Sequence, residues 1–140
     1  MSKIRTLIVD DELLARDRIA ELLESDQEIE IIGQCADGRK AVTAIREQSP
    51  DLLFLDVQMP VLDGFEVLKA IGGRRMPVVI FVTAYDQYAL RAFDFHALDY
   101  LLKPFSRARF KKALQRAKHQ IGRKQNGEIN QRLLSLLEQL

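Results

Sequence analysis

Five short apolar stretches alternate with amphipathic segments along the chain. The stretches at 52–55 and 78–82 are apolar at every position, which is typical of parallel strands that are covered on both faces. The stretches at 4–9 and 99–102 predict two further short strands. Residues 29–35 begin with an alternation of apolar and polar residues, so they predict a strand that is less deeply buried.

Each segment between these strands predicts a helix with one buried face. Asp63 followed by Glu66 resembles a capping box at the start of the third helix, and Ser106 is a candidate cap for the last one. The fourth helix, expected over residues 86–95, is weak in pattern and rich in alanine. Strands that alternate with helices predict an α/β fold, in which right-handed crossovers cover both faces of a parallel sheet. The clearest apolar faces are Ala15, Ile19, Leu22 and Leu23, then Ala41, Val42 and Ile45, then Val67, Leu68 and Ile71, and finally Phe110, Ala113, Leu114, Ala117 and Ile121.

Composition limits the alternatives. A chain of 140 residues with 47% hydrophobic content is long enough for one domain with its own core. The single cysteine, Cys35, cannot form an internal disulfide, and we therefore expect a reducing compartment, the cytoplasm. The sequence shows no signal peptide and no apolar run near the ~18 residues of a membrane span.

Charge is distributed unevenly. Residues 1–104 hold 12 Lys and Arg against 18 Asp and Glu, whereas residues 105–140 hold 9 against 2. A basic C-terminal segment can indicate nucleic acid binding. We prefer a solvated helix face, because the basic residues occupy helical positions and no aromatic residue is interleaved among them to stack on bases.

Chemically active side chains follow four of the predicted strands. Asp10 and Asp11 follow the first strand and Asp56 the third, while Thr83 ends the fourth and Lys103 follows the fifth. The carboxyl ends of parallel strands lie at one edge of a sheet, so we expect these side chains to converge there. Clustered carboxylates repel one another, and a hard cation such as Mg²⁺ would relieve that repulsion with oxygen ligands. The lysine and threonine suit phosphate oxygens.

Taken singly, each of these residues has an ordinary explanation. An aspartate after a strand is usually a cap or a turn residue, and Lys103-Pro104 is a turn signal. The information lies in the joint arrangement on four strand ends. No Cys or His lies near the cluster in the sequence, which argues against zinc.

The complete set resembles the receiver domain of bacterial two-component response regulators over residues 3–121. The resemblance implies a flavodoxin-like fold, a three-layer (βα)5 sandwich whose parallel sheet has the strand order 2-1-3-4-5. The motifs that carry it are Val9-Asp10-Asp11-Glu12, Leu55-Asp56-Val57-Gln58-Met59-Pro60 with Asp63-Gly64, Val82-Thr83-Ala84, and Tyr100-Leu101-Leu102-Lys103-Pro104-Phe105.

The resemblance also assigns roles at the site. Asp56 is expected to be the phosphoacceptor, which takes a phosphoryl group from a sensor histidine kinase. Asp10 and Asp11, together with Asp56 and the backbone carbonyl of Gln58, are expected to hold Mg²⁺. Lys103 is expected to pair with the phosphoryl group.

Further residues are implied in switching and in phosphoryl lifetime. Thr83 is expected to bind a phosphoryl oxygen and Tyr100 to be the switch aromatic, while the peptide before Pro104 is expected to be cis. Gln58 and Tyr85 lie two residues beyond the phosphoacceptor and the threonine. We expect these two residues to tune the lifetime of the aspartyl phosphate.

A narrower resemblance concerns residues 85–100, which are similar to regulators of the LytR/AlgR type. Those regulators carry a LytTR DNA-binding domain after the receiver. We therefore expect a receiver domain at 1–121 and a linker helix at 122–140 that leads toward a C-terminal effector domain. DNA is expected to be contacted only through that effector domain, with no membrane involved.

The linker has its own pattern. Gly122, Asn126 and Gly127 predict a break after the last receiver helix. Ile129, Leu133, Leu136 and Leu140 then follow at the spacing of a short a/d seam. A helix this short is not stable on its own in water. The seam is therefore expected to be helical only where other residues cover its apolar side chains. Its own receiver, a second copy or the effector domain could do so, and the LytR/AlgR resemblance favours the effector. A stand-alone receiver with a docking tail is the alternative.

Phosphorylation is expected to pair two receivers through the face of the fourth helix, fifth strand and fifth helix.

Two other functions compete with a phosphorylation switch. A haloacid dehalogenase-type phosphatase also uses a strand-end aspartate with Mg²⁺, but it needs a second aspartate two residues later, and position 58 is glutamine. A degenerate receiver would bind partners without phosphorylation, yet every key residue is present. We therefore expect a phosphoacceptor with self-catalysed transfer and autodephosphorylation rather than an enzyme.

Overall fold

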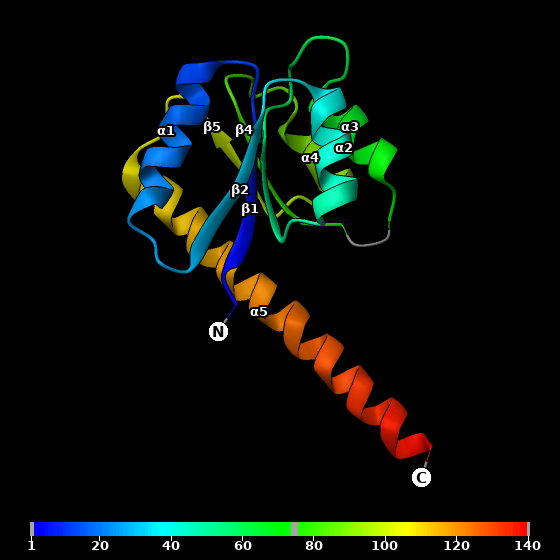
Figure 1. Ribbon diagram of the computed structural model, residues 1–140. Coiled ribbons are helices and arrows are strands. Elements are labelled where there is room, and N and C mark those ends of the chain that lie inside the picture. Colours follow the sequence, from blue (N-terminus) through cyan, green and yellow to red (C-terminus); the bar gives the residue numbers. More distant parts are fainter. Residues whose placement is uncertain (1, 74–75, 140) are drawn as a thin grey trace.

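The computed structural model describes residues 2–73 and 76–139 and contains five parallel strands that alternate with five helices along the chain (Figure 1). The strand order is β2-β1-β3-β4-β5, so the predicted flavodoxin-like α/β fold is confirmed. The strands are β1 (Ile4–Val9), β2 (Ile29–Cys35), β3 (Leu52–Leu55), β4 (Val78–Thr83) and β5 (Asp99–Leu102), and the helices are α1 (Leu13–Glu24), α2 (Gly38–Gln48), α3 (Gly64–Ile71), α4 (Ala89–Asp94) and α5 (Arg107–Glu138).

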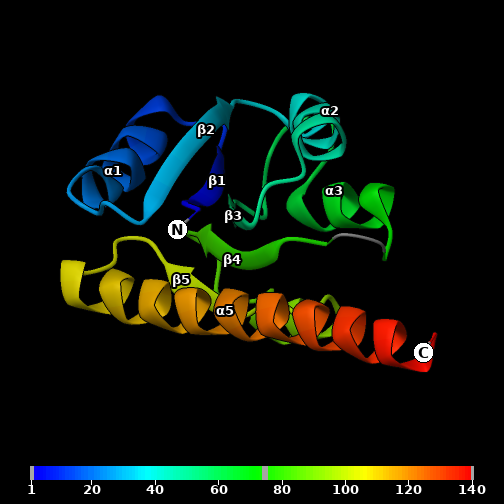
Figure 2. The ribbon, with the colours of Figure 1, turned by 60° about the horizontal axis from the view of Figure 1, so that its bottom comes forward.

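Helices cover both faces of the sheet. Helices α1 and α5 pack on one face, and α2, α3 and α4 pack on the other (Figures 1 and 2). Successive residues of the central strands point to opposite faces, so Phe54 and Ile80 meet α5 while Leu53 and Phe81 meet the other three helices. This explains why the central strands are apolar at every position.

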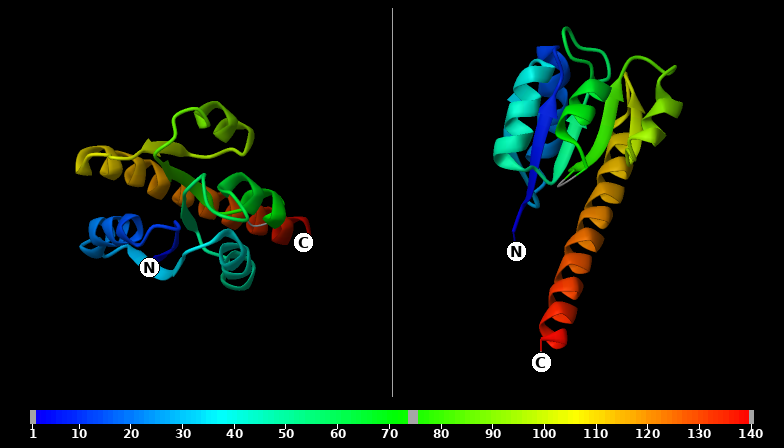
Figure 3. Two further views of the ribbon diagram at one scale, coloured as in Figure 1. Left: turned by 90° about the horizontal axis from the view of Figure 1, so that it is seen from above. Right: turned by 90° about the vertical axis from the view of Figure 1, so that its right-hand side faces the viewer.

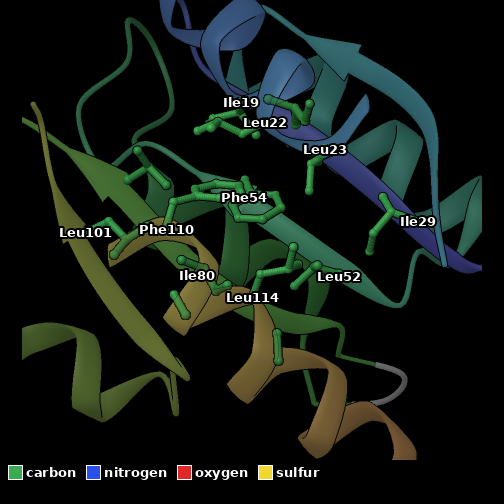
Figure 4. Packing of buried hydrophobic residues seen from close by; sticks show 14 of the residues in the cluster. Ile19, Leu22, Leu23, Ile29, Leu52, Phe54, Ile80, Leu101, Phe110 and Leu114 are labelled. Carbon is green, nitrogen blue, oxygen red and sulfur yellow. The ribbon is translucent and has the colours of Figure 1, made fainter. Parts of the chain in front are cut away.

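An aromatic pair anchors α5 to the sheet. Phe54 of β3 and Phe110 of α5 are both fully buried, and their rings stack with centroids 5.4 Å apart (Figure 4). Burial of a phenylalanine side chain stabilises a fold by roughly 2–3 kcal/mol. The predicted stripe on this helix is buried at all five of its positions. Helix α5 is therefore held firmly at its N-terminal half.

The predicted caps are confirmed. Asp63 and Glu66 form a reciprocal capping box at the start of α3, and the Ser106 side chain accepts a hydrogen bond from the backbone amide of Arg109. The peptide between Lys103 and Pro104 is cis, as the resemblance implied. The loop between β3 and α3 contains Val61 at a positive φ of 71°.

Two predictions about helix boundaries are wrong. Helix α4 begins at Ala89 and not at residue 86. Helix α5 continues through Gly122, Asn126 and Gly127 to Glu138 without the predicted break. A glycine inside a helix costs only about 1 kcal/mol, and adding residues to a helix that is already nucleated and anchored avoids the unfavourable nucleation step.

The tail also differs from expectation in its exposure. Helix α5 extends well beyond the end of the sheet that holds the N-terminus (Figures 1 and 3). Leu133 and Leu136 are 54% and 60% exposed, so this part of the helix forms although neither leucine is covered. The side chains of Ile129 and Leu140 lie outside the described residues. Among the described residues, no helix combines the length and the apolar character needed to cross a membrane.

Candidate functional site

The polar residues at the strand ends converge as the topology requires. Val9 of β1 pairs with Leu55 of β3, so Asp10 and Asp56 leave the sheet side by side. Thr83 ends the neighbouring strand β4. These three side chains are nearly or fully buried, at 1%, 5% and 0% exposure for Asp10, Asp56 and Thr83. Burial of two carboxylates at one edge requires a charged partner.

Lys103 supplies that partner. Its Nζ lies 2.7 Å from Asp10 Oδ2, 3.3 Å from Asp56 Oδ2 and 3.8 Å from Glu12 Oε1. Burial alone would lower the pKa of Lys103, but its hydrogen bond to Asp10 and the negative charges around it outweigh burial and raise that pKa. The lysine therefore stays charged.

Asp56 differs from an ordinary surface carboxylate. Its pKa is raised, first by burial and then by the negative charge of Asp10, although Lys103 and Thr83 act in the opposite direction. Its Oδ1 also accepts a weak hydrogen bond from the backbone amide of Gln58, at 3.3 Å. One lysine thus incompletely compensates two buried carboxylates, and a further cation would be stabilised here.

The donor set fits such a cation. Carboxylate oxygens of Asp10, Asp11, Glu12 and Asp56 all lie within 4.8 Å of one another. Hard divalent ions prefer an all-oxygen environment of this kind. The sequence pattern had predicted Asp10, Asp11 and Asp56 as ligands but had not indicated Glu12. Its position directly after Asp11 was the available signal.

An open cleft of about 540 Å³ leads to this cluster. Its lining combines carboxylates, Lys103 and the two residues predicted to tune lifetime, Gln58 and Tyr85. Asp56 is one of the residues that line this cleft, so the cleft gives access to its carboxylate.

Thr83 and Tyr100 both contact the loop between β4 and α4. The Thr83 hydroxyl accepts a hydrogen bond from the backbone amide of Tyr85 at 3.4 Å, and the Tyr100 hydroxyl donates to the Tyr85 carbonyl. Burial, with the negative charge of Asp56 as the next cause, raises the pKa of Tyr100 to about 12. Tyr100 is thus neutral at physiological pH and able to donate this hydrogen bond.

A glycine brings α3 against the end of β3. The Gly64 amide donates to the Val57 carbonyl at 2.7 Å, and a Cβ on Gly64 would lie 2.5 Å from the Asp56 carbonyl oxygen. Only glycine fits this approach without movement of the backbone. The Asp63-Gly64 pair therefore positions the loop that carries Asp56.

Tyr88 is a second residue that sequence reasoning missed. Its hydroxyl lies 3.0 Å from Nε2 of Gln58, which donates to it across the rim of the cleft, and its ring packs edge-on against Tyr85. No sequence pattern signals this contact, because the two hydrogen-bonded residues are 30 positions apart.

Comparison with known proteins gives consistent results. The response regulator receiver domain model matches residues 6–115. The transcriptional regulatory protein BtsR of Salmonella typhi is 44% identical over 117 residues, which represent 84% of this chain and 49% of the relative. The chain thus spans about half the length of the curated relatives it matches.

Solved structures agree with these matches. The response regulatory domain of protein mrkE from Klebsiella pneumoniae superposes with a TM-score of 0.80 at 31% identity, covering 85% of this chain and 98% of that one. A chain of the CheX-CheY-BeF3-Mg²⁺ complex from Borrelia burgdorferi superposes with a TM-score of 0.73 at 26% identity, covering 81% and 87%. Response regulator receiver domains are phosphoacceptors and are not classed as enzymes in general. The family match and the convergent acidic edge together place this chain in the response regulator receiver domain family of two-component systems, among relatives that regulate transcription.

Proposed function

We propose that this receiver takes a phosphoryl group on Asp56 from a sensor histidine kinase. The observation that carries the proposal is the environment of Asp56: a carboxylate with 5% exposure at the floor of an open cleft, 3.3 Å from the Lys103 ammonium. In the transfer, an Asp56 oxygen forms a bond to phosphorus while the bond from phosphorus to the kinase histidine nitrogen breaks.

The surrounding residues assist by position and charge. Phosphoryl transfer needs little covalent chemistry from the protein, so catalysis consists mainly of orientation and charge stabilisation. Lys103 is placed to pair with the incoming phosphoryl oxygens. The Thr83 hydroxyl accepts from the Tyr85 amide and keeps its own proton, which it can donate to another of these oxygens. The incoming negative charge would also compete with Asp10 for the lysine.

Receiver domains generally bind Mg²⁺ at the acidic pocket. In this chain Asp10, Asp11, Asp56 and the backbone carbonyl of Gln58 would hold it, and Glu12 is close enough to take part through a carboxylate oxygen. The ion would supply positive charge that offsets the carboxylates and the phosphoryl oxygens. The complex with BeF3 and Mg²⁺ that contains a related chain supports this assignment.

The proposed switch couples Thr83 to Tyr100. Thr83 accepts a hydrogen bond from the backbone amide of Tyr85, and Tyr100 donates one to the carbonyl of the same residue. Movement of the Thr83 hydroxyl toward a phosphoryl group would change that loop and so bias the position of the Tyr100 ring. A coupling free energy of about 1–3 kcal/mol would suffice for a regulatory shift.

The output face is formed by α4, β5 and α5. Receiver domains can dimerise, and this face exposes Leu90, Phe93 and Leu102 at 82%, 73% and 44%. We propose that phosphorylation promotes homodimerisation there. Exposed apolar groups of this kind favour association.

We further propose a LytTR-type DNA-binding output, with 1–121 as the receiver and 122–140 as the linker helix. The narrower sequence resemblance over residues 85–100 supports this assignment. So does the relative that is named a transcriptional regulatory protein, because the matched residues represent only 49% of its length. The continuous α5 supports a rigid rather than a flexible linker. We expect signalling to take place in the cytoplasm.

Acetyl phosphate with Mg²⁺ followed by intact mass measurement tests phosphoacceptance. Wild-type protein is expected to gain one phosphate mass and Asp56→Asn to gain none. Asp94→Asn, which changes an exposed aspartate of α4, is the matched control and is expected to behave as wild type. Equal phosphorylation of Asp56→Asn would overturn the proposal.

Sedimentation tests the switch and the dimer. Phosphorylated wild type is expected to dimerise, whereas Thr83→Ala is expected to accept the phosphate and remain monomeric. Comparing chains that end at residue 121 and at residue 140 separates the contribution of the linker helix. Monomers in every phosphorylated sample at high micromolar concentration would exclude dimerisation as the signal.

A further inference from the structure

One tyrosine connects the two side chains at the rim of the cleft. Gln58, from the loop after β3, donates through Nε2 to the Tyr88 hydroxyl at 3.0 Å. Tyr85, from the loop after β4, packs its ring against the Tyr88 ring with centroids 6.2 Å apart at an interplanar angle of 63°. Gln58 and Tyr85 line the same cleft as Asp56, and Tyr88 contacts both of them.

Tyr88 is itself held in place. It directly precedes α4, and its carbonyl accepts a hydrogen bond from the Ala92 amide at 3.2 Å. Its ring meets the ring of Phe65 edge-on, with centroids 6.2 Å apart. Phe65 belongs to α3 and is fully buried in the core that α2, α3 and α4 form with the sheet. The tyrosine is therefore a fixed support rather than a free surface side chain.

We propose that Tyr88 is a positioning residue that lengthens the life of the aspartyl phosphate by holding Gln58 at the rim. The inference rests on the proposed phosphorylation of Asp56 and deepens it. A glutamine amide that is tied to a rigid phenol loses most of its rotamer freedom, so it stays beside Asp56 and narrows the path of water. The Tyr85 ring packs on the same tyrosine and also lines the cleft, so it adds to this cover.

Hydrolysis is the step that this arrangement slows. A water oxygen forms a bond to phosphorus, the bond between phosphorus and the Asp56 oxygen breaks, and the carboxylate, inorganic phosphate and a proton are released. Loss of one ordinary hydrogen bond at the rim corresponds to a rate increase of about three- to fivefold.

The test measures decay of the phosphorylated protein by intact mass after acetyl phosphate is removed. Tyr88→Phe keeps the ring against Phe65 and removes only the hydroxyl. Gln58→Leu breaks the same hydrogen bond from its other end, so a folding defect in one variant does not prevent the test. Gln27→Leu changes an exposed amide far from the cleft and serves as the matched control, with decay at the wild-type rate.

The double variant separates positioning from a general loss of structure. We expect each single variant to decay about three- to fivefold faster than wild type, and the double variant to decay no faster than the faster single one. Decay of Tyr88→Phe at the wild-type rate overturns the inference, and so do effects that multiply in the double variant. Failure of wild type to gain phosphate mass would refute the proposed function instead, so the two failures are distinguishable.

Discussion

Replacement of Gly64 with alanine is expected to destabilise the protein and to disturb Asp56. The glycine amide is tied to the Val57 carbonyl at 2.7 Å, which holds the start of α3 against the end of β3. A Cβ at position 64 would lie 2.5 Å from the Asp56 carbonyl oxygen and 3.2 Å from the Val57 Cα, whereas ordinary contact begins at 3.4 Å. The two backbones must therefore separate by about 0.9 Å, the difference between 3.4 and 2.5 Å.

The magnitude follows from what can move. Both obstructing groups are backbone atoms, so no side chain can rotate away from the new methyl group. Overpacking of this kind typically costs about 1–3 kcal/mol, and the better helix propensity of alanine returns up to about 1 kcal/mol. We expect a net loss of about 2 kcal/mol in the free energy of unfolding, taking the upper end of the overpacking range.

Urea unfolding and phosphorylation kinetics measure the two consequences. Gly122→Ala is the matched control, because nothing lies within 4 Å of its added Cβ and the site is inside α5. That variant is expected to gain up to about 1 kcal/mol. Because displacement of a reacting group by about 1 Å can slow a reaction up to about a hundredfold, Gly64→Ala is also expected to react more slowly with acetyl phosphate. An unchanged urea midpoint for Gly64→Ala would show that α3 can recede freely, and the reasoning would be refuted.

Three further variants test separate features of the structure. The Asp99 carboxylate forms an ion pair with Arg109 at 2.7 Å. Burial acts to raise the pKa of this carboxyl, but the arginine contacts outweigh burial and lower it. Asp99→Asn is expected to reduce the free energy of unfolding by about 1 kcal/mol at pH 7. A lowered pKa in the folded state contributes stability above the unfolded-state pKa, and this stability is lost as the pH falls through the folded-state pKa. The difference in unfolding free energy between wild type and variant, measured in urea titrations, should therefore shrink below about pH 4. A difference that stays constant with pH would contradict this assignment. Val61 has a φ of 71°, which strains a β-branched residue, and its side chain is 73% exposed. Val61→Gly is therefore expected to raise the free energy of unfolding by up to about 1 kcal/mol. A lower melting temperature for this variant would argue against strain at this position. Millimolar Mg²⁺ is expected to raise the melting temperature of wild type and to have a weaker effect on Asp11→Asn; equal shifts would count against a role for Asp11 in metal binding.

Local patterns along the chain predicted most of the fold. Continuous apolar runs marked the central strands, and the pair Asp63 and Glu66 marked the start of α3 with its capping box. These signals are local, because each depends on residues within a few positions of one another. The strand order came from the family resemblance, since the run of Val78–Thr83 contains nothing that states which strands will flank it.

The boundaries of α4 and α5 were predicted less well. Gly122 is a weak local breaker, and the anchoring of Phe110 on Phe54 lies outside any local window. A short window therefore overestimated the effect of glycine, because it did not include the stabilised helix that precedes it.

At the site, the sequence by itself determined which chemical groups stand at the strand ends, because parallel topology sends Asp10, Asp56 and Lys103 to one edge. Only the tertiary structure decided how these charges are shared: the lysine lies closer to Asp10 than to Asp56. The contact between Gln58 and Tyr88 likewise depends on two loops that meet in space. Whether a segment forms a strand depends mainly on residues close to one another in the sequence. The distance between two side chains from different strands depends on the packing of every element between them.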